Sequence, residues 1–461
     1  MNVGSAAALL DERMARAAEA HGLPVVSYGL LLGGELVHVA SLGDLPDGAT
    51  SSFRIASMTK SFTAATVLSL RDEGRLTLDT PLGDVLPWAR TVGLPAQSPP
   101  LRVEHLLSMT GGFPTDDPWG DREESTPLEA FDALVAGGLT FCRVPGIEFE
   151  YANIGYALLG RVISQVTGQD YRDVVRERLL DPLGMTSSTF DVAAVTRRVV
   201  GMHPVGSGLA EQIEGPSGAF SPMGGLWSTI EDLARWVGFL ESAWADSPDT
   251  GPLSRWSRRE MQRPRVVIGH DEDGVIDSYG WGLRGAHPPT LGRFVHHSGG
   301  YPGFGSHMRW HPDTRWAVVA LANRTYAPMR LACAAALGEI VADDAAEAAR
   351  IRAVDRLWPQ TEAAMVLAES LLADWDDAAL DALAAVNLDL DQPRAERREA
   401  WQALTAGEVR RDPASVTSRS PAHARWTVET DSGRVELDVL LTGEREPRLQ
   451  ALAARPLDEG P

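Results

Sequence analysis

The sequence predicts an α/β protein of the α+β type, in which helices flank one antiparallel sheet. Strand-like segments lie near the two ends of the first 345 residues, at 25–31, 35–41, 278–284, 292–297, 304–310 and 316–322. The chain between them has helical periodicity, so we expect a sheet built from both ends around a helical insertion. Beyond residue 345, a segment with helical periodicity precedes a second group of expected strands. These observations predict a large domain over 1–345 and a small α+β domain over 346–461.

Local signals define the expected elements. The pair Gly33-Gly34 between two strand-like segments is typical of a hairpin turn, and Gly74 ends a helix that starts at residue 57. Further helices are expected at 5–21, 102–108, 127–136, 153–167, 171–180, 229–243 and 328–342. In the tail, a helical stretch at 346–385 is followed by strands at 424–430, 434–440 and 447–453.

Charge and hydropathy exclude several kinds of partner. The chain has 461 residues, with 42 basic and 63 acidic side chains, which gives a net charge of −21. Nucleic acids and anionic membranes bind clustered basic residues, so neither is an expected partner. No segment approaches the ~18 consecutive apolar residues of a membrane span, and residues 1–24 lack a basic segment followed by an apolar one. We therefore expect a soluble, cytoplasmic protein.

One lysine stands out in a chain that otherwise uses arginine, because Lys60 is the only lysine among the 42 basic residues. An arginine keeps its proton at accessible pH, whereas a lysine with a lowered pKa can act as a base. Ser57 lies three residues earlier, so on a helix the two side chains share a face. A helix start also offers free N–H groups to a negatively charged oxygen. Ser57 and Lys60 are therefore a candidate nucleophile and base; the alternative is a capping serine beside a solvated lysine.

A tyrosine and an asparagine, Tyr151 and Asn153, precede an expected helix and form a second candidate group. Spaced two residues apart, they can project into one cleft. There the phenol would move protons, and the amide would orient Lys60 or a substrate carbonyl. The alternative is an asparagine N-cap preceded by a packing tyrosine.

A third segment, residues 296–301 with the letters HHSGGY, runs from a strand into glycines. Glycines at a strand edge allow close approach, and a backbone N–H there can complete an oxyanion hole. The chain also has His296, His297, His307 and His311 close together. Adjacent histidines on a strand point to opposite faces, and no carboxylate at ligand spacing accompanies them, so no metal site is expected.

Three motifs follow one another along the chain: Ser57-x-x-Lys60, Tyr151-x-Asn153 and His297-Ser298-Gly299. Their order and approximate spacing resemble those of serine β-lactamases and penicillin-binding-protein-like hydrolases, above all the class C-like branch with its esterases and D-amino-acid peptidases. Further segments that resemble the family are GRLTLDTP at 74–81, LLSMTGG at 106–112, DPLGM at 181–185 and GGLWST at 224–229. The resemblance covers about residues 8–342 and implies a β-lactamase-like fold with a helical subdomain.

The resemblance implies a role for each motif residue. Ser57 would be the acylated nucleophile, while Lys60 and Tyr151 would share the general-base and general-acid work. Asn153 would position the lysine or the substrate, and the backbone N–H groups of Ser57 and Gly300 would form the oxyanion hole. No metal or organic cofactor is implied. Residues expected to line the substrate cleft are Trp119 in the loop 113–122, Trp227, Ser298, Gly299 and Tyr301.

The third motif departs from that of true β-lactamases and transpeptidases, which starts with a lysine that helps hold a substrate carboxylate. Here His297 occupies the position and is neutral for much of the physiological range. This histidine resembles the esterase and aminopeptidase branches and disfavours antibiotic hydrolysis. Because no export signal is expected, a role in peptidoglycan metabolism is also disfavoured.

The function predicted from the sequence is that of a serine hydrolase. It would cleave an ester or amide of a small molecule or short peptide through an acyl-Ser57 intermediate. Two alternatives remain open. The same acyl-enzyme serves acyltransferases and peptide-cyclising thioesterases of this fold, in which an amine or alcohol replaces water. A non-catalytic binding or sensor module could also keep the cleft.

Overall fold

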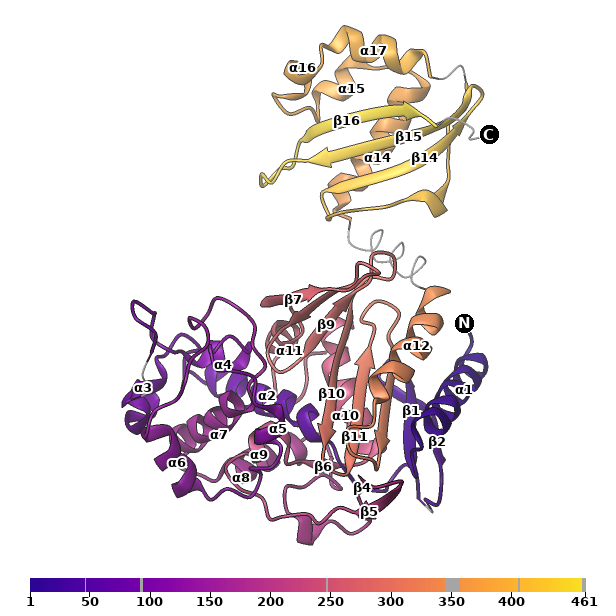
Figure 1. The fold of residues 1–461 in the computed structure, drawn as a ribbon. Helices are drawn as coiled ribbons and strands as arrows, with labels where there is room; N and C mark the ends of the chain where they lie inside the picture. Colours follow the sequence, from indigo (N-terminus) through magenta and orange to yellow (C-terminus); the bar gives the residue numbers. More distant parts are fainter. Residues whose placement is uncertain (46, 92–93, 246–247, 345–356, 405–406, 458–461) are drawn as a thin grey trace. The chain divides into compact units, whose positions relative to one another are not determined.

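An eight-stranded antiparallel sheet lies at the centre of residues 1–344 in the computed structural model (Figure 1). Its strand order is β2-β1-β12-β11-β10-β9-β8-β7. β1 pairs with β12, so the N-terminal hairpin joins strands from the far end of the same unit. The prediction of a sheet built from both ends is confirmed. The strands are β1 (Val26–Leu32), β2 (Glu35–Leu42), β7 (Val266–His270), β8 (Ile276–Tyr279), β9 (Arg284–His287), β10 (Phe294–Tyr301), β11 (Phe304–Trp310) and β12 (Trp316–Ala322).

The chain divides into two units, residues 1–344 and 345–461, and each has a hydrophobic core of its own. The structure describes residues 1–461 except 46, 92–93, 246–247, 345–356, 405–406 and 458–461. Within these limits, no helix is long and apolar enough to cross a membrane.

The turn between β1 and β2 sets the register of the sheet. Gly33 and Gly34 both have positive φ, 64° and 88°, and two consecutive left-handed residues make the turn that matches the twist of paired strands. The turn pairs Leu32 of β1 with Glu35 of β2. After a register shift, Leu30 pairs with His38 of β2, and on its other side Leu30 faces Val318 of β12. β1 is thus paired along both edges, and it is almost wholly buried.

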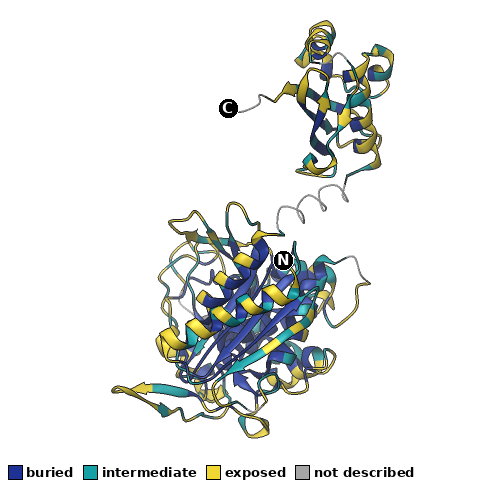
Figure 2. Cartoon of the chain, turned by 90° about the vertical axis from the view of Figure 1, so that its right-hand side faces the viewer, coloured by how far each residue is buried: buried dark blue, intermediate teal, exposed yellow. Residues whose placement is uncertain are grey.

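Helices cover both faces of the sheet. α1 (Val3–His21) and α12 (Met329–Ala342) pack against each other and cover one face, α1 over β2 and α12 over β11 and β12. α10 (Ile230–Glu241) packs against β1, β2 and β12 from the other face. Figure 2 shows buried strands behind helices whose outer surfaces are exposed. This layered arrangement is the fold class predicted from the sequence.

The chain between β2 and β7 makes up the helical part of the unit. Besides α10, its helices are α2 (Thr59–Asp72), α3 (Leu82–Val85), α4 (Val103–Leu107), α5 (Asp117–Gly120), α6 (Leu128–Ala136), α7 (Asn153–Thr167), α8 (Tyr171–Val175), α9 (Ser221–Gly224) and α11 (Arg255–Met261). Short 3-10 turns are η1 (Ala56–Met58), η2 (Pro87–Thr91), η4 (Val192–Ala194) and η5 (Ser242–Trp244). Two small antiparallel pairs complete it, β3 (Phe53–Arg54) with β6 (Trp227–Ser228) and β4 (Met202–Val205) with β5 (Gly208–Glu211).

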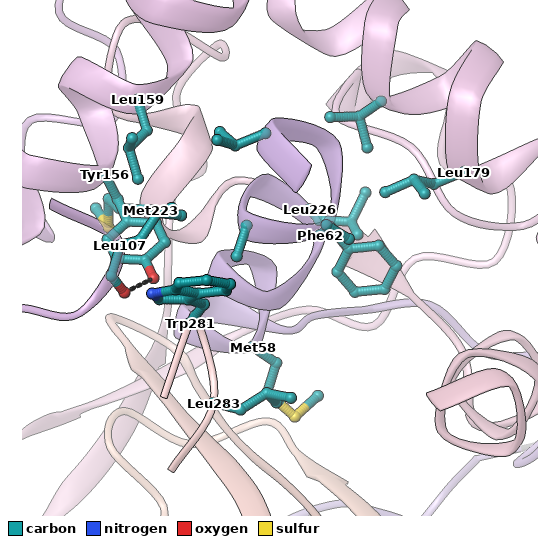
Figure 3. Packing of buried hydrophobic residues seen from close by; sticks show 14 of the residues in the cluster. Met58, Phe62, Leu107, Tyr156, Leu159, Leu179, Met223, Leu226, Trp281 and Leu283 are labelled. Carbon is teal, nitrogen blue, oxygen red and sulfur yellow. Dashed lines mark hydrogen bonds between the residues drawn. The ribbon is translucent and has the colours of Figure 1, made fainter. Parts of the chain in front are cut away.

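α2 is the buried centre of this helical part, and every residue from Thr59 to Leu70 is buried. Figure 3 shows apolar side chains from neighbouring segments packed around it. Phe62 stacks on Trp236 of α10 with ring centroids 4.1 Å apart, and the indole N–H donates to Ser61 Oγ at 3.0 Å. A helix that is buried all round is held by its neighbours, so the side chains at its N-terminal end have fixed positions.

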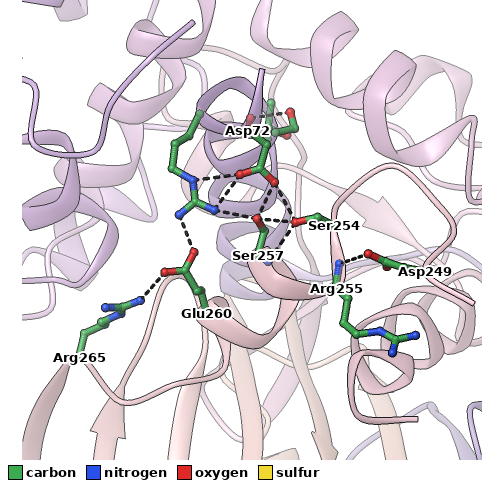
Figure 4. A network of polar contacts seen from close by, with 10 residues as sticks. Asp72, Asp249, Ser254, Arg255, Ser257, Glu260 and Arg265 are labelled. Carbon is green, nitrogen blue, oxygen red and sulfur yellow. Dashed lines mark hydrogen bonds and ion pairs between the residues drawn. The ribbon is translucent and has the colours of Figure 1, made fainter. Parts of the chain in front are cut away.

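A polar network holds the other end of α2 (Figure 4). Arg71 donates to Ser257 Oγ at 2.7 Å and to Glu260 at 2.6 Å, both on α11. Asp72 accepts from Ser257 Oγ at 2.5 Å and from Ser254 Oγ at 3.1 Å. Because these bonds join two helices rather than neighbours within one, they tie the C-terminal end of α2 to α11.

The structure corrects the predicted elements at several places. The strand expected at 278–284 is two strands, β8 and β9, because Gly282 has a φ of 71° and Gly280 lies directly on the backbone at the end of α11. β7 has no counterpart among the predicted strands. The helix expected at 171–180 is an α-helix only over α8 and continues as a π-helical turn, η3 (Arg176–Leu180). The helix expected from residue 57 begins as η1, and α2 itself starts at Thr59.

The second unit is an α+β structure in the part of the chain that is described. Its helices are α14 (Pro359–Ala373), α15 (Asp377–Asp381), α16 (Leu388–Asp391) and α17 (Arg394–Gln402), followed by the 3-10 turn η6 (Pro413–Ser415). Its antiparallel sheet has the order β13 (Arg410–Arg411), β14 (His423–Thr430), β15 (Gly433–Leu441) and β16 (Leu449–Pro456). α14 packs on β14 and β15. Residues 346–356 of the expected helical stretch lie outside the described residues.

Trp236→Phe is expected to destabilise the first unit. The substitution leaves a cavity beside Phe62 and removes the indole N–H that donates to Ser61 Oγ. Together these losses should lower the free energy of unfolding by about 2–4 kcal/mol. Thermal unfolding followed by circular dichroism should show a lower midpoint. Trp256→Phe is the matched control, because Trp256 is 55% exposed and its replacement should cost about 0.5 kcal/mol or less. Equal shifts in the two variants would contradict this role for Trp236.

Candidate active site

The segment that carries Ser57 is held from two sides. On one side β3 pairs with β6, and Ile55 N donates to Leu226 O at 3.0 Å. On the other side, Ser306 Oγ of β11 donates to Ile55 O at 2.8 Å. Gly299 of β10 lies directly on Ile55, where a Cβ would come within 2.2 Å of the carbonyl oxygen. These contacts fix η1, in which Ser57 is only 7% exposed.

The residue before the serine has an unusual backbone. Ala56 has a φ of 49°, in the left-handed region that residues with a Cβ rarely adopt. Such a conformation persists where the surroundings hold it, and it is frequent at active sites. It precedes Ser57 directly, so the strained position and the candidate nucleophile belong to one turn.

Lys60 Nζ is fully buried and has three hydrogen-bond acceptors. They are Ser57 Oγ at 2.9 Å, Asn153 Oδ1 at 2.7 Å and Met223 O of α9 at 2.8 Å. An ammonium group has three protons, so these acceptors satisfy it completely. A neutral amine has two protons and one lone pair, and only Ser57 can donate in return, because the other two partners are carbonyl oxygens. Loss of a proton from Lys60 therefore reverses the bond, so that the Ser57 hydroxyl donates to Nζ.

The surroundings of Lys60 lower its pKa to about 8, and burial is the largest cause. The carboxylates of Asp117, Asp121 and Asp116 oppose this effect, since negative charge favours the ammonium form. Arg284 adds to the lowering by charge repulsion. Lys60 can therefore lose or accept a proton at a pH only slightly above neutral.

Asn153 is the first residue of α7, and its side chain bonds to Lys60 instead of capping the helix. The helix is capped from the loop before α5, where Asp116 Oδ1 accepts from Asn153 N at 2.6 Å and Oδ2 accepts from Ile154 N at 2.9 Å. Asp117 Oδ1 accepts from Asn153 Nδ2 at 2.8 Å. The alternative reading of Asn153 as an N-cap is therefore wrong.

Tyr151 lies beside Lys60, with its ring centroid 5.0 Å from Nζ. Burial is the largest of the causes that raise the pKa of Tyr151 well above its usual value, and the neighbouring Ser57 hydroxyl opposes the shift. The phenol is therefore protonated at neutral pH. It can donate or pass on a proton, whereas a tyrosinate base is disfavoured.

β10 has an open edge next to Ser57. β9 pairs with β10 only over 294–296, while β11 pairs with β10 as far as the turn after Tyr301. The two-residue turn pairs Tyr301 of β10 with Phe304 of β11. In an antiparallel ladder, the backbone N–H and C=O groups of every second residue point to the same side of the strand. Ser298 and Gly300 therefore turn their backbone groups away from β11. The N–H of Gly300 points toward the cavity that this edge borders.

His297 is buried and uncharged. Its Nδ1 lies 2.7 Å from Ser298 O, which can only accept, so Nδ1 carries the proton and Nε2 accepts from Tyr279 OH at 3.2 Å. Burial is the main cause that lowers the pKa of His297 to about 3, and the charges of Lys60 and Arg284 add to it. The position that holds a lysine in true β-lactamases is therefore neutral here.

A cavity of about 370 Å³ brings together residues from all three motifs. Of the predicted site residues, those that line it are Ser57, Tyr151, His297, Ser298 and Gly300. Lys60 and Asn153 are fully buried next to it. Residues of the three motifs, which lie far apart in the sequence, thus meet at one cavity.

Two aromatic residues expected in the substrate cleft are core side chains instead. Trp227 is fully buried and meets Phe304 edge-on at 5.3 Å. Tyr301 is also buried and covers the guanidinium of Arg54, with 4.4 Å between the ring centroid and Cζ. Both predictions are corrected, because these rings surround a buried arginine and pack the interior.

The remaining two candidates also have other contacts. Gly299 lies against the carbonyl of Ile55, behind the nucleophile. Trp119 is 40% exposed and rests edge-on upon Phe220, with centroids 5.4 Å apart. The loop 113–122 nevertheless reaches the cavity, through the acidic side chains on either side of Trp119.

Sequence reasoning missed the charged walls of the cavity. One wall has Asp117 and Asp121, and Asp121 Oδ2 accepts from Tyr326 OH at 3.0 Å. Burial is the largest cause that raises the pKa of Asp121 to about 7. The lining also includes the basic side chains of Arg284 and Arg330 and a third carboxylate, Asp277. None of these residues belongs to a motif, and the only available signal was the position of two aspartates in the loop 113–122.

No group of three or more histidine, cysteine, aspartate or glutamate side chains that could hold a metal ion occurs among the residues whose positions are described. At the cavity the chain brings together a hydroxyl (Ser57), an amine (Lys60), a phenol (Tyr151) and backbone N–H groups.

Comparison with known proteins places this geometry in a family. A family model described as Beta-lactamase matches residues 6–342. Protein flp of Staphylococcus aureus is 29% identical over 285 residues, which cover 59% of this chain and 53% of that protein. The chain thus spans about half the length of this curated relative.

Solved structures show the same fold. The octameric penicillin-binding protein homologue of Pyrococcus abyssi has a TM-score of 0.65 at 19% identity, and the match covers 98% of this chain and 100% of that one. The β-lactamase/D-alanine carboxypeptidase of Yersinia pestis has a TM-score of 0.60 at 25% identity, covering 74% of this chain and 100% of that one. Since the family model spans nearly the whole first unit and the fold agrees, the chain belongs to the β-lactamase family.

Proposed function

We propose that this chain hydrolyses an ester or amide bond of a small molecule or short peptide through an acyl intermediate on Ser57. The observation that carries the proposal is the set of three acceptors around Lys60, of which only Ser57 can return a proton. Neutral Lys60 takes this proton as the serine oxygen attacks the carbonyl carbon. The hydrogen bonds that link Ser57, Lys60 and Asn153 argue against a non-catalytic binding module.

Tyr151 completes the path of the proton. The bond between the carbonyl carbon and the leaving group breaks, and the proton held by Lys60 reaches the leaving group by way of the protonated phenol. A water molecule then attacks the acyl carbon, and its proton returns to Ser57 Oγ through the same two side chains. The N–H groups of Ser57 and Gly300 would bind the oxyanion in both halves of the reaction.

The charged walls of the cavity favour a substrate with charged groups. Neutral His297 cannot hold a carboxylate by charge, whereas Arg284 can, and no hydrogen bond or ion pair to its guanidinium occurs among the described residues. Asp117 and Asp121 line the same cavity with side chains of the opposite sign. A short peptide, with an amine and a carboxylate, matches both signs. The neighbour from Yersinia pestis is named a carboxypeptidase, which supports the same substrate class.

The rate at which Ser57 reacts is expected to rise with pH about a midpoint near 8, because only neutral Lys60 can take the proton. Arg284→Gln removes a positive charge that favours the neutral amine, so the midpoint should move to higher pH. The measurement is the labelling rate with a fluorophosphonate across the pH range. Arg161→Gln is the control, since Arg161 pairs with Asp132 away from Lys60, and its midpoint should stay unchanged. A midpoint below about 6 would contradict the assignment of Lys60 as base.

Ser57→Ala should abolish fluorophosphonate labelling, which mass spectrometry of the full chain detects directly. Lys60→Met and Lys60→Arg both remove a base that can lose a proton, one without and one with the charge. Each should slow labelling by about 10²–10⁴-fold, the usual loss for general-base catalysis. The assignment fails if Ser57→Ala is still labelled. It also fails if either lysine variant, with a thermal midpoint like that of the unmodified chain, keeps more than about a tenth of the rate.

A further inference from the structure

Asn153 bonds to two partners through opposite ends of one amide. Its Oδ1 accepts from Lys60 Nζ at 2.7 Å, and its Nδ2 donates to Asp117 Oδ1 at 2.8 Å. Asn153 is fully buried, so water does not offer the amide other partners. The two ends of the amide look alike in shape and differ only in whether they donate or accept. Which end faces Lys60 therefore depends on the chemistry of the residue at the far end.

Asp117 settles the orientation of this amide. A carboxylate can only accept hydrogen bonds, so the donating Nδ2 must face it and Oδ1 must face Lys60. With the amide reversed, Oδ1 would face a carboxylate, and two acceptors in contact leave buried polar atoms without partners, which is costly. A reversed amide would also present its N–H groups to Lys60. The neutral amine could then turn its lone pair toward Asn153 and away from Ser57.

The segment around Asp117 is shaped to hold Asn153. Asp116 accepts from the backbone N–H groups of Asn153 and Ile154, which fixes the start of α7. Gly120 lies so close that a Cβ there would come within 2.9 Å of Asn153 Cβ and 3.2 Å of Nδ2. Three residues of one short segment thus contact a single asparagine, through its backbone, its amide and its Cβ.

From these contacts the geometry points to Asp117 as a positioning residue of the active site. Asp117 fixes the amide of Asn153 so that the lone pair of neutral Lys60 can point only at the Ser57 hydroxyl. The inference rests on the proposed function, because it assumes that Lys60 is the base. It gives the carboxylate a role that requires no contact with the substrate.

Asp117→Asn is the central variant, since it keeps the shape of the side chain but replaces a carboxylate with an amide that can donate or accept. Asn153 then has no preferred orientation. We expect the plateau labelling rate at high pH to fall about 10- to 100-fold, by analogy with the loss when a hydrogen-bond partner that orients a metal-ligating side chain is replaced. The midpoint of the pH profile should also fall, because removing negative charge favours neutral Lys60.

The groups that act on Lys60 come from several elements, so the pH midpoint alone does not identify the role of Asp117. They are Asp116, Asp117, Asp121, Glu124, Tyr151, Tyr156, Arg284 and His297. A double-mutant cycle separates positioning from charge. In Asn153→Ala no amide remains to be oriented, so adding Asp117→Asn should change the plateau by less than about twofold while still lowering the midpoint.

Two further variants complete the test. Gly120→Ala displaces Asn153 without changing any charge, so it should lower the plateau and leave the midpoint in place; it also carries the test if Asp117→Asn unfolds. Asp132→Asn is the matched control, since Asp132 binds Arg161 further along α7, and both plateau and midpoint should stay unchanged.

The inference and the function on which it rests fail in different ways. A plateau in Asp117→Asn within about threefold of the unmodified chain overturns the positioning role, and so does an equal loss in the Asn153→Ala background. In both cases Ser57 is still labelled. Absence of labelling in the unmodified chain, or labelling of Ser57→Ala, overturns the proposed function itself.

Discussion

The hydrogen bonds of Lys60 Nζ are the constraint on which the rest of the active site depends. The amine is fully buried, so its lone pair must find a donor among its protein partners, and of its three partners only Ser57 has one. Around an exposed lysine, water would accept and donate freely, and no direction would be imposed on the bond to Ser57. Burial thus has two effects here: it lowers the pKa, and it aims the lone pair.

The fold supplies two of the three acceptors through one short ladder. Met223 lies in α9, just before β6, and β6 pairs with β3, which leads into η1 and Ser57. The same pairing therefore places both a carbonyl oxygen and a hydroxyl against the start of α2. The third acceptor, Asn153, opens α7, which packs directly on α2. The large sheet contributes an edge: β10 continues past the end of β9 and leaves the N–H of Gly300 facing the cavity.

How far the sequence predicts this site depends on how local each interaction is. Ser57 and Lys60 are three residues apart, so helix geometry brings them together. Tyr151 and Asn153 were predicted from their positions next to the start of one helix. Asp117 and Arg284 reach the site only because segments distant in the sequence pack together. Their spacing from the motif residues therefore does not identify them as site residues. Trp227 was expected to line the cleft, but in the folded chain it is fully buried, because a large aromatic ring gains most from packing in the core. The turn at Gly282, which separates β8 from β9, was also not predicted, because a single glycine within a strand-like segment does not by itself identify a turn.

One loop sets both the geometry and the charge of the base. Asp116, Asp117 and Asp121 raise the pKa of Lys60 against the effect of burial, and two of the three also hold Asn153. A much lower pKa would leave more neutral amine at pH 7 but make it a weaker base, whereas a higher pKa would leave almost none. Because the carboxylate of Asp117 both orients the amide of Asn153 and raises the pKa of Lys60, a substitution at Asp117 changes both properties of the base.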